Sequence, residues 1–224
     1  MPGVVTISAS FGAGGSIVGP QVADRLRLPF YDRALPAAVA QRLDVPVQEA
    51  VAFDEKAPSG WDRVAQFFAR AAVPVGADVP VSEGVLDPDA FRAETEKVLH
   101  HIADTTGGVV LGRAAMVVLG GRPDTLCVRL DGPVEQRIAQ ACAREQLSEP
   151  EARRLQRDLD AARDAYLKVF YRRNATDIRL YHLVIDATAL PVESCVDLIV
   201  AAARARFARA GAVPAGSQPL EGQP

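Results

Sequence analysis

A glycine-rich turn lies near the beginning of the 224-residue chain. The apolar segment Val4-Val5-Thr6-Ile7 leads into Gly12-Ala13-Gly14-Gly15-Ser16, and a helical pattern follows. A strand, a glycine-rich turn and a helix N-terminus in this order direct backbone N–H groups and the positive end of the helix dipole toward one point, which suits an anion. Compared with the phosphate-loop pattern G-x-x-x-x-G-K-[ST], this chain keeps Gly14 and Ser16 but has Ala9 and Gly15 in the first-glycine and lysine positions. We therefore predict a phosphate-binding loop that lacks its own cation.

Arg113 is the second residue whose type and position suit phosphate. It follows the apolar run Gly108-Val109-Val110-Leu111-Gly112, which has the character of a strand buried on both faces. A guanidinium group can make a bidentate contact with a phosphate group. Because ligands of parallel α/β sheets gather at the carboxyl ends of the strands, we expect Arg113 and the glycine-rich turn to lie at the same edge.

Strand and helix patterns alternate along most of the chain, which predicts an α/β fold with a parallel sheet. Residues 36–106 are rich in helical patterns and predict a helical insertion between strands. The segment 210–224 has almost no large apolar residues, so we expect a disordered tail. The predicted strands of the core are 4–7, 108–112, 125–130 and 183–186, and the predicted helices are 17–28, 133–146, a helix opening at 148–151, and 191–209.

The composition indicates a globular protein whose partners are small molecules. Hydrophobic residues make up 49% of the chain, the net charge is −3 and the pI is about 5.7. This charge gives no electrostatic reason to expect binding to nucleic acid or to an anionic membrane. The three cysteines are far apart and form no C-x-x-C motif, and no signal segment is apparent, so we expect a cytoplasmic protein.

Several short motifs, taken together and in order, resemble the cytidylate kinase-like proteins of the P-loop nucleoside monophosphate kinase superfamily. The similarity extends without a break in order from residue 4 to about residue 203. The chain also shows departures. The wider kinase superfamily has lysine at the position of Gly15, whereas the chain's own branch tolerates glycine there but usually has arginine at the position of Ala9, and cytidylate kinases proper have an acid at the position of Leu111. The motifs that carry the resemblance are VTIS-x-x-F-G-A-G-G-S (5–16), F-Y-D-R (30–33), D-E-K-A-P-S (54–59), V-L-G-R (110–113), the stretch from Glu135 to Tyr166, and Y-H-L-V-I-D (181–186).

The resemblance implies a P-loop NTPase-type, three-layer α/β/α fold with a parallel sheet, a helical insertion that binds the monophosphate, and a helical lid. It implies transfer of the ATP γ-phosphoryl group to a nucleoside monophosphate, CMP or dCMP, with Mg²⁺ as cofactor. ATP and this monophosphate would be the partners of a monomer or homodimer. On this basis the core comprises 1–34 and 107–209, the insertion 35–106, and the lid about 145–166.

The resemblance also implies roles for single residues. The ATP phosphates would be held by the amides of the loop, and Ser16 would also reach Mg²⁺. Asp32 and Arg113 would face the acceptor nucleotide, and Asp160 would position the arginines. The implied phosphate-binding residues are Gly12, Ala13, Gly14, Gly15 and Ser16, the implied catalytic arginines are Arg113, Arg157 and Arg163, and the implied lid residues are Arg137, Arg153 and Asp160.

Spacing alone leaves other interpretations open. Charged residues three and four apart between 153 and 164 are also typical of a solvated helix face with weak ion pairs. Asp32 could cap a helix. The substitutions at Ala9, Gly15 and Leu111 favour, as a second hypothesis, a nucleotide-binding protein without transferase activity. A third hypothesis is an interaction module that has lost both ligands.

Overall fold

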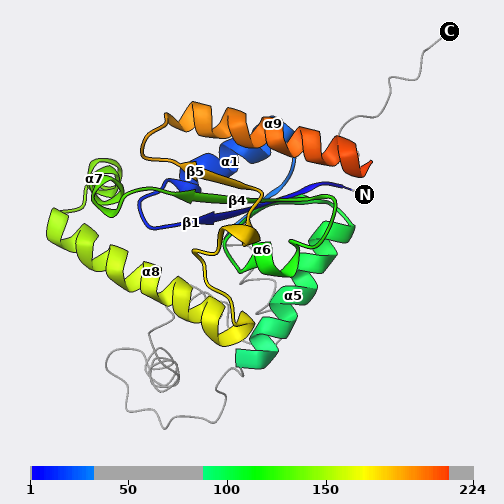
Figure 1. The fold of residues 1–224 in the computed structure, drawn as a ribbon, viewed down its shortest axis with the longest axis horizontal. Helices are drawn as coiled ribbons and strands as arrows, with labels where there is room; N and C mark the ends of the chain where they lie inside the picture. The colour runs from blue at the N-terminus through cyan, green and yellow to red at the C-terminus, as the bar shows by residue number, and fades with distance from the viewer. Residues whose placement is uncertain (1, 33–87, 212–224) are drawn as a thin grey trace, which may run out of the picture.

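The structure is a computed structural model that describes residues 2–32 and 88–211 (Figure 1). Its centre is a five-stranded sheet in the order β2-β3-β1-β4-β5, and every neighbouring pair of strands is parallel. The sheet therefore has one carboxyl edge, at which all five strands end. The strands are β1 (Val4–Ala9), β2 (Phe30–Tyr31), β3 (Gly108–Leu111), β4 (Thr125–Asp131) and β5 (Leu183–Asp186).

The longest pairing joins β1 and β4 at the middle of the sheet. Their register runs from Val4 opposite Thr125 to Ala9 opposite Leu130. Both strands are apolar and buried over most of their length because helices cover both faces of the sheet. This register places the first residues of the glycine-rich loop directly beside the end of β4.

Two helices cover one face of the sheet, α1 (Gly15–Leu26) and α9 (Val192–Ala210). Val18, Val22 and Leu26 recur every four residues along α1 and are buried against the sheet and α9. The helix ends where Arg27 adopts a left-handed conformation with φ 55°. Packing against this apolar stripe fixes the start of α1, and with it the loop, relative to the strands.

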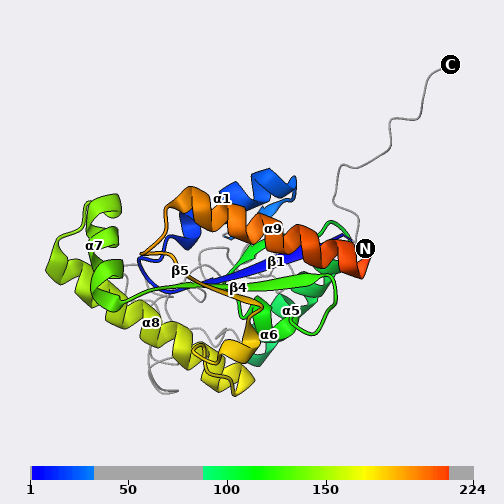
Figure 2. The same cartoon turned by 45° about the horizontal axis from the view of Figure 1, so that its top comes forward.

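The opposite face carries α5 (Pro88–Asp104) and the short α6 (Ala115–Val118), as Figure 2 shows. Leu99 of α5 and Ala115 of α6 are fully buried. Helices on both faces of a parallel sheet make three layers, so the α/β, three-layer fold expected from the sequence is confirmed. The four residues of α6 are too few to show a helical period, and this helix is absent from the sequence prediction.

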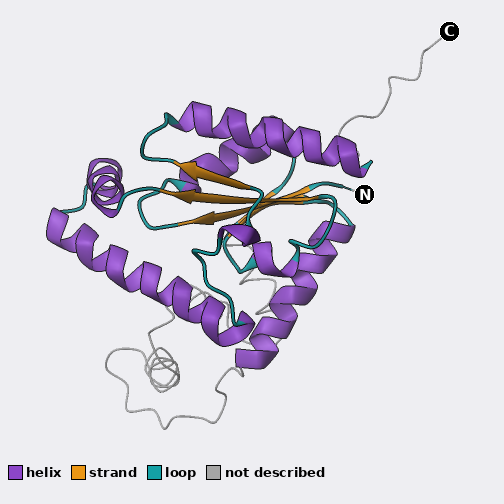
Figure 3. Ribbon diagram, in the orientation of Figure 1, coloured by secondary structure: helices purple, strands orange, loops and turns teal. Residues whose placement is uncertain are grey.

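Two further helices begin beyond the carboxyl edge, toward which the strand arrows of Figure 3 point, and the second of them runs back to pack against α6. They are α7 (Val134–Glu145) and α8 (Glu149–Tyr171), and a 3₁₀ turn, η1 (Ile178–Leu180), precedes β5. Ser148 occupies the N-cap position of α8 as expected, but its hydroxyl accepts no capping hydrogen bond. Phe11 packs with Ile138, Ala141 and Ala152, and so joins the loop to both helices.

Some predicted segments fall outside the described residues. These are most of the predicted insertion, residues 33–87, and most of the predicted tail, residues 212–224. Of the insertion, the structure describes its last helix, α5. At the other end, α9 continues to Ala210, and Gly211 caps it in a left-handed conformation.

Candidate functional site

A cavity of about 730 Å³ lies at the carboxyl edge of the sheet. The glycine-rich loop forms one wall, and the turn after β3, with Arg113, forms another. Residues of α7 and α8 also line it. The two elements that the sequence singled out for phosphate therefore lie in one cavity, as parallel strand order requires.

The loop presents its backbone to this cavity. Gly12 and Gly14 have φ of 76° and 78°, a left-handed conformation that costs residues with a side chain about 1–2 kcal/mol. Within the described part of the chain, no acceptor is paired with the amides of Gly12, Gly14, Gly15 or Ser16, whereas the Ala13 amide donates to Ser10 O at 3.0 Å. Unpaired amides at the N-terminus of a helix form an anion-binding concavity.

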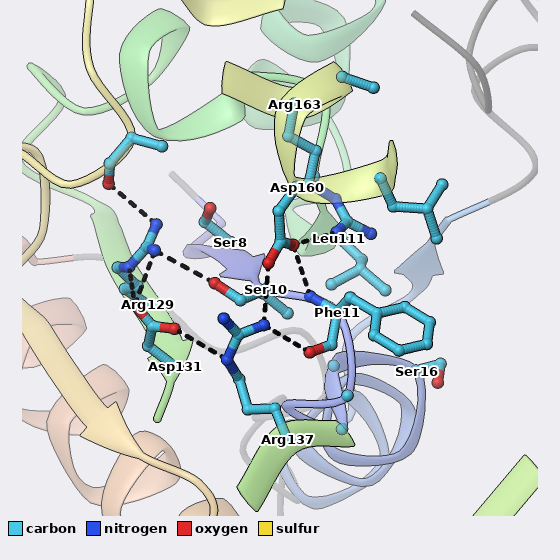
Figure 4. Close-up of a pocket in the computed structure, with 18 of the residues that line it drawn as sticks. Ser8, Ser10, Phe11, Ser16, Leu111, Arg129, Asp131, Arg137, Asp160 and Arg163 are labelled. Atoms are coloured by element: carbon cyan, nitrogen blue, oxygen red, sulfur yellow. Dashed lines mark hydrogen bonds and ion pairs between the residues drawn. The ribbon is translucent and has the colours of Figure 1, made fainter. Parts of the chain in front are cut away.

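Asp160 of α8 and Arg137 of α7 fasten the loop to these two helices (Figure 4). The Phe11 amide donates to Asp160 Oδ1 at 2.9 Å. Arg137 Nη1 donates to Phe11 O at 2.7 Å and to Asp160 Oδ2 at 2.9 Å, and Arg137 Nε donates to Gly132 O. Arg137 is only 5% exposed. The sequence resemblance gave Arg137 to the lid, whereas the structure places it on α7, where it supports the loop.

Arg129 is a residue of the site that the sequence reasoning missed. It lies on β4, is 9% exposed, and donates through Nε and Nη2 to Asp131 Oδ2 at 3.0 and 2.7 Å. Its Nη2 also donates to Ser10 Oγ at 3.1 Å, and its Nη1 donates to Ala175 O at 2.9 Å. A charged residue within the apolar strand 125–130 was the signal that could have found it.

The hydrogen bonds of Arg129 also act on its partner carboxylate. Burial tends to raise the pKa of Asp131, but hydrogen bonds and charge from Arg129 outweigh burial and hold that pKa below its ordinary value. Arg137 Nε lies 3.5 Å from the other oxygen, Asp131 Oδ1. Asp131 is therefore a charged link between two arginines at neutral pH.

The position of the Cβ atom of a lysine at position 15 is already filled. A Cβ atom built on Gly15 would lie 2.6 Å from Ala9 Cβ and 3.0 Å from Leu111 Cδ1. Contacts as short as 2.6 Å do not occur between real Cβ atoms, so a side chain at Gly15 requires the neighbouring residues to move. Ala9, Gly15 and Leu111, which the sequence singled out separately, thus form one packed unit.

Arg113 lies on a left-handed turn at the other wall of the cavity. Gly112, Arg113 and Ala114 have φ of 79°, 61° and 51°. Arg113 Nη2 donates to Asp32 O at 2.7 Å. Burial lowers the pKa of Arg113 to about 10, although Asp32 and Tyr166 act in the opposite direction. The structure thus brings Asp32 and Arg113 together at the cavity wall.

The predicted residues of α8 are divided between the cavity and the solvent. Asp160 and Arg163 line the cavity, and Arg163 Nη1 donates to Asp160 Oδ1 at 3.2 Å. Arg157 is exposed and does not line the cavity. Arg153 pairs instead with Glu135 and Glu149. For Arg153 and Arg157, the structure matches the alternative of a solvated helix face.

The described residues were also compared with the requirements of a metal site and of a membrane-spanning helix. Within residues 2–32 and 88–211, no three His, Cys, Asp or Glu side chains gather as a metal site. No helix in the same ranges is long and apolar enough to cross a membrane.

Known proteins match this chain both in sequence family and in fold. Residues 4–189 match the model of the cytidylate kinase-like family. The fold is similar to that of an uncharacterized protein from Eubacterium ventriosum ATCC 27560, with a TM-score of 0.64, 17% identity, and coverage of 90% of this chain and 98% of the other. A shikimate kinase from Bacteroides thetaiotaomicron gives a TM-score of 0.49 at 15% identity, over 89% of this chain and 97% of the kinase.

A curated relative matches only part of the chain. The uronate isomerase of Corynebacterium glutamicum is 31% identical over 109 residues, which are 49% of this chain. The match covers 21% of the isomerase, about a fifth of its length.

Proposed function

The chain belongs to the cytidylate kinase-like family, and from this premise we propose that it is a P-loop kinase acting on a nucleoside monophosphate. In the proposed reaction, an oxygen of the acceptor phosphate attacks the γ-phosphorus of ATP, and the bond from that phosphorus to the β,γ-bridging oxygen breaks. The products are ADP and a nucleoside diphosphate. CMP and dCMP are the proposed acceptors, because the resemblance is to cytidylate kinases.

One observation carries the proposal: two phosphate-recognising elements face a single cavity from different walls. The loop amides of residues 12–16 suit the donor phosphates, and Arg113, held near Asp32, suits the acceptor phosphate. Phosphoryl transfer requires mainly that two nucleotides be aligned and that charge on the transferred group be neutralised. A shared cavity between these elements supplies the alignment.

Residues of α8 suit the space between the two nucleotides. Arg163 lines the cavity and has a half-exposed side chain, so it can leave Asp160 for a phosphate oxygen. Asp160 then remains bonded to the Phe11 amide and to Arg137. In this account Arg163 neutralises the transferred group, and Asp160 is a positioning residue. Cover from α7 and α8 would also exclude water from the γ-phosphate.

Mg²⁺ is compatible with the residues present. The Ser16 hydroxyl lies on the cavity wall at the start of α1 and offers one oxygen ligand. Since no cluster of three acidic or histidine ligands exists in the described residues, phosphate oxygens would supply most of the coordination. The chemistry that Mg²⁺ would supply when bound is neutralisation of negative charge on the phosphate groups.

A coupled assay of ADP release tests the proposal. Mg-ATP would be supplied with each common ribonucleoside and deoxyribonucleoside monophosphate in turn, with EDTA as the control for Mg²⁺. We expect turnover with a cytidine monophosphate that falls steeply in Arg113→Ala. No transfer to any monophosphate at high enzyme concentration would reject the kinase.

The filled lysine position favours a second candidate, a nucleotide-binding protein that performs no transfer. Ala9 and Leu111 lie where the Cβ atom of a lysine at position 15 would be, so the loop as it stands does not accommodate the lysine of the phosphate-loop pattern. Calorimetry that detects ATP binding by a protein without turnover would favour this candidate, and measurable turnover would refute it.

A further inference from the structure

The cavity needs a cation near the loop that the loop itself does not provide. A bound triphosphate brings several negative charges to the amides of residues 12–16, and backbone dipoles neutralise them only in part. Gly15 carries no side chain, and Ala9 and Leu111 fill the space beside it. Positive charge must therefore reach the phosphates from another element.

Most arginines of the cavity are already engaged. Arg129 donates to Asp131, Ser10 and Ala175, and Arg137 donates to Gly132, Phe11 and Asp160. Both are buried beside the loop and hold it in place. Arg163 is paired with Asp160. Arg113 belongs to the turn after β3, beside Asp32.

Arg144 differs from these four arginines. It lines the cavity, its side chain is exposed, and it makes no hydrogen bond or ion pair with any residue in the described part of the chain. A Cβ atom built on Gly14 would lie 2.7 Å from Arg144 Nη1. The guanidinium group is thus next to the residue that caps α1 and whose amide faces the cavity.

Helical spacing on α7 explains why Arg144 reaches the loop. Arg137, Ala141 and Arg144 are separated by four and three residues, so they share one face of the helix. Arg137 and Ala141 are buried against the loop, and Ala141 packs with Phe11. The same face, one turn farther on, carries Arg144 over Gly14. The helix position is therefore fixed by buried contacts, and only the side chain of Arg144 is left to move.

We infer that Arg144 supplies the positive charge at the phosphate loop and contacts the phosphate groups of the bound nucleotide. This inference rests on the proposed function, because it names a further binding residue of the same site. A lysine in the loop would emerge from α1, whereas Arg144 comes from α7, on the cover of the cavity. Phosphate binding would thus tie α7 to the start of α1.

Isothermal calorimetry on the full chain tests the inference with two ligands, ATP and inorganic tripolyphosphate. The variants are Arg144→Ala and Arg144→Gln, and the matched control is Arg154→Ala, an exposed arginine of α8 that does not line the cavity. We expect each Arg144 variant to bind both ligands about 10- to 100-fold more weakly, the usual effect of removing a charged hydrogen bond. The control should bind like the wild type, and thermal unfolding should show all variants folded.

The two ligands separate the possible failures. Unchanged tripolyphosphate affinity in both Arg144 variants overturns the inference, and weaker binding of ATP alone would mean that Arg144 contacts the nucleoside. A wild-type protein that binds neither ligand would instead contradict the proposed function.

Discussion

The two walls of the cavity are built by different means. At the donor wall, side chains of alternating charge run beside the glycine-rich loop and bond to its residues Ser10 and Phe11 (Figure 4). At the acceptor wall, Arg113 is placed by three consecutive left-handed residues, and its Nη2 donates a hydrogen bond to Asp32 O. The charged series of the donor wall consists of Arg129, Asp131, Arg137, Asp160 and Arg163.

This difference indicates how each wall responds to a ligand. The donor wall has its charges balanced by neighbours before any nucleotide binds, so the loop is preorganised. The acceptor wall holds a guanidinium whose pKa burial lowers to about 10, on a backbone where Arg113 and Ala114 have positive φ. Strain of this kind persists where the surrounding structure enforces it, and it is concentrated at functional sites. We expect substitutions in the buried pairs of the donor wall, such as those at Arg137, to affect mainly stability, and substitutions at Arg113 to affect mainly the reaction.

Removing Arg137 should remove the hydrogen bonds that hold the loop to α7 and give the largest effect on stability. Arg137→Met leaves Asp160, Phe11 O and Gly132 O without their buried partner. Breaking a buried ion pair by removing one partner costs about 3–5 kcal/mol, and urea unfolding would measure it. A loss below about 1 kcal/mol would show that these bonds do not hold the loop.

Two glycines with nearly equal φ compare the walls directly. Gly12→Ala places a Cβ 2.2 Å from Arg137 O, whereas Gly112→Ala meets no atom within 4 Å. Each variant should lose about 1–2 kcal/mol of unfolding free energy because alanine is unfavourable in the left-handed conformation. Gly12→Ala should lose about 1–3 kcal/mol more because of the steric clash. The difference between the two losses of unfolding free energy therefore measures how closely α7 packs on the loop. Equal losses would contradict close packing of α7 on the loop.

Removing Arg113 should affect the reaction and leave ATP binding unchanged. Arg113→Ala is expected to lower kcat/KM for the acceptor about 10- to 100-fold, because a charged contact with its phosphate is lost. Steady-state kinetics with varied monophosphate, beside calorimetry with ATP, would measure both effects. A matching loss of ATP affinity would place Arg113 at the donor phosphates and remove the distinction between the walls.

Acidification should weaken the donor wall by a smaller amount. The pKa of Asp131 lies below its ordinary value of 3.8 in the folded protein, although burial opposes this shift, because Arg129 bonds to the carboxylate. A lowered folded-state pKa contributes stability above the unfolded value, and this contribution is lost as pH falls through the folded pKa. Urea unfolding between pH 6 and about pH 3 should therefore lose less stability in Asp131→Asn than in the wild type. Parallel curves would show that this carboxylate has no such role.

The sequence predicted the parts of the fold that follow from local periodicity. Strand 4–7, the helix from residue 17 and the loop between them have strong signals, because apolar spacing and glycines act over a few residues. The position of Arg113 at the same edge as the loop followed from parallel strand order.

Tertiary contacts decided the rest. Arg129 and Arg144 enter the site because β4 and α7 lie beside the loop, and no local pattern states which guanidinium group finds a partner. Ala9, Gly15 and Leu111 appear in the sequence as separate departures, yet they meet as one cluster. Arg137 was expected to move with a lid, although its burial by Phe11 and Gly132 depends on contacts between distant segments.

In the proposed function, backbone amides at the start of α1 bind the nucleotide phosphates without a lysine. Amide ¹⁵N–¹H spectra recorded during titration with ATP test it most directly, because each amide reports its own hydrogen bond. We predict that the largest shifts occur at Gly12, Gly14, Gly15 and Ser16, and that the Ala13 amide, already bonded to Ser10 O, moves less. Saturation with ATP that leaves these four amides unmoved would contradict the account.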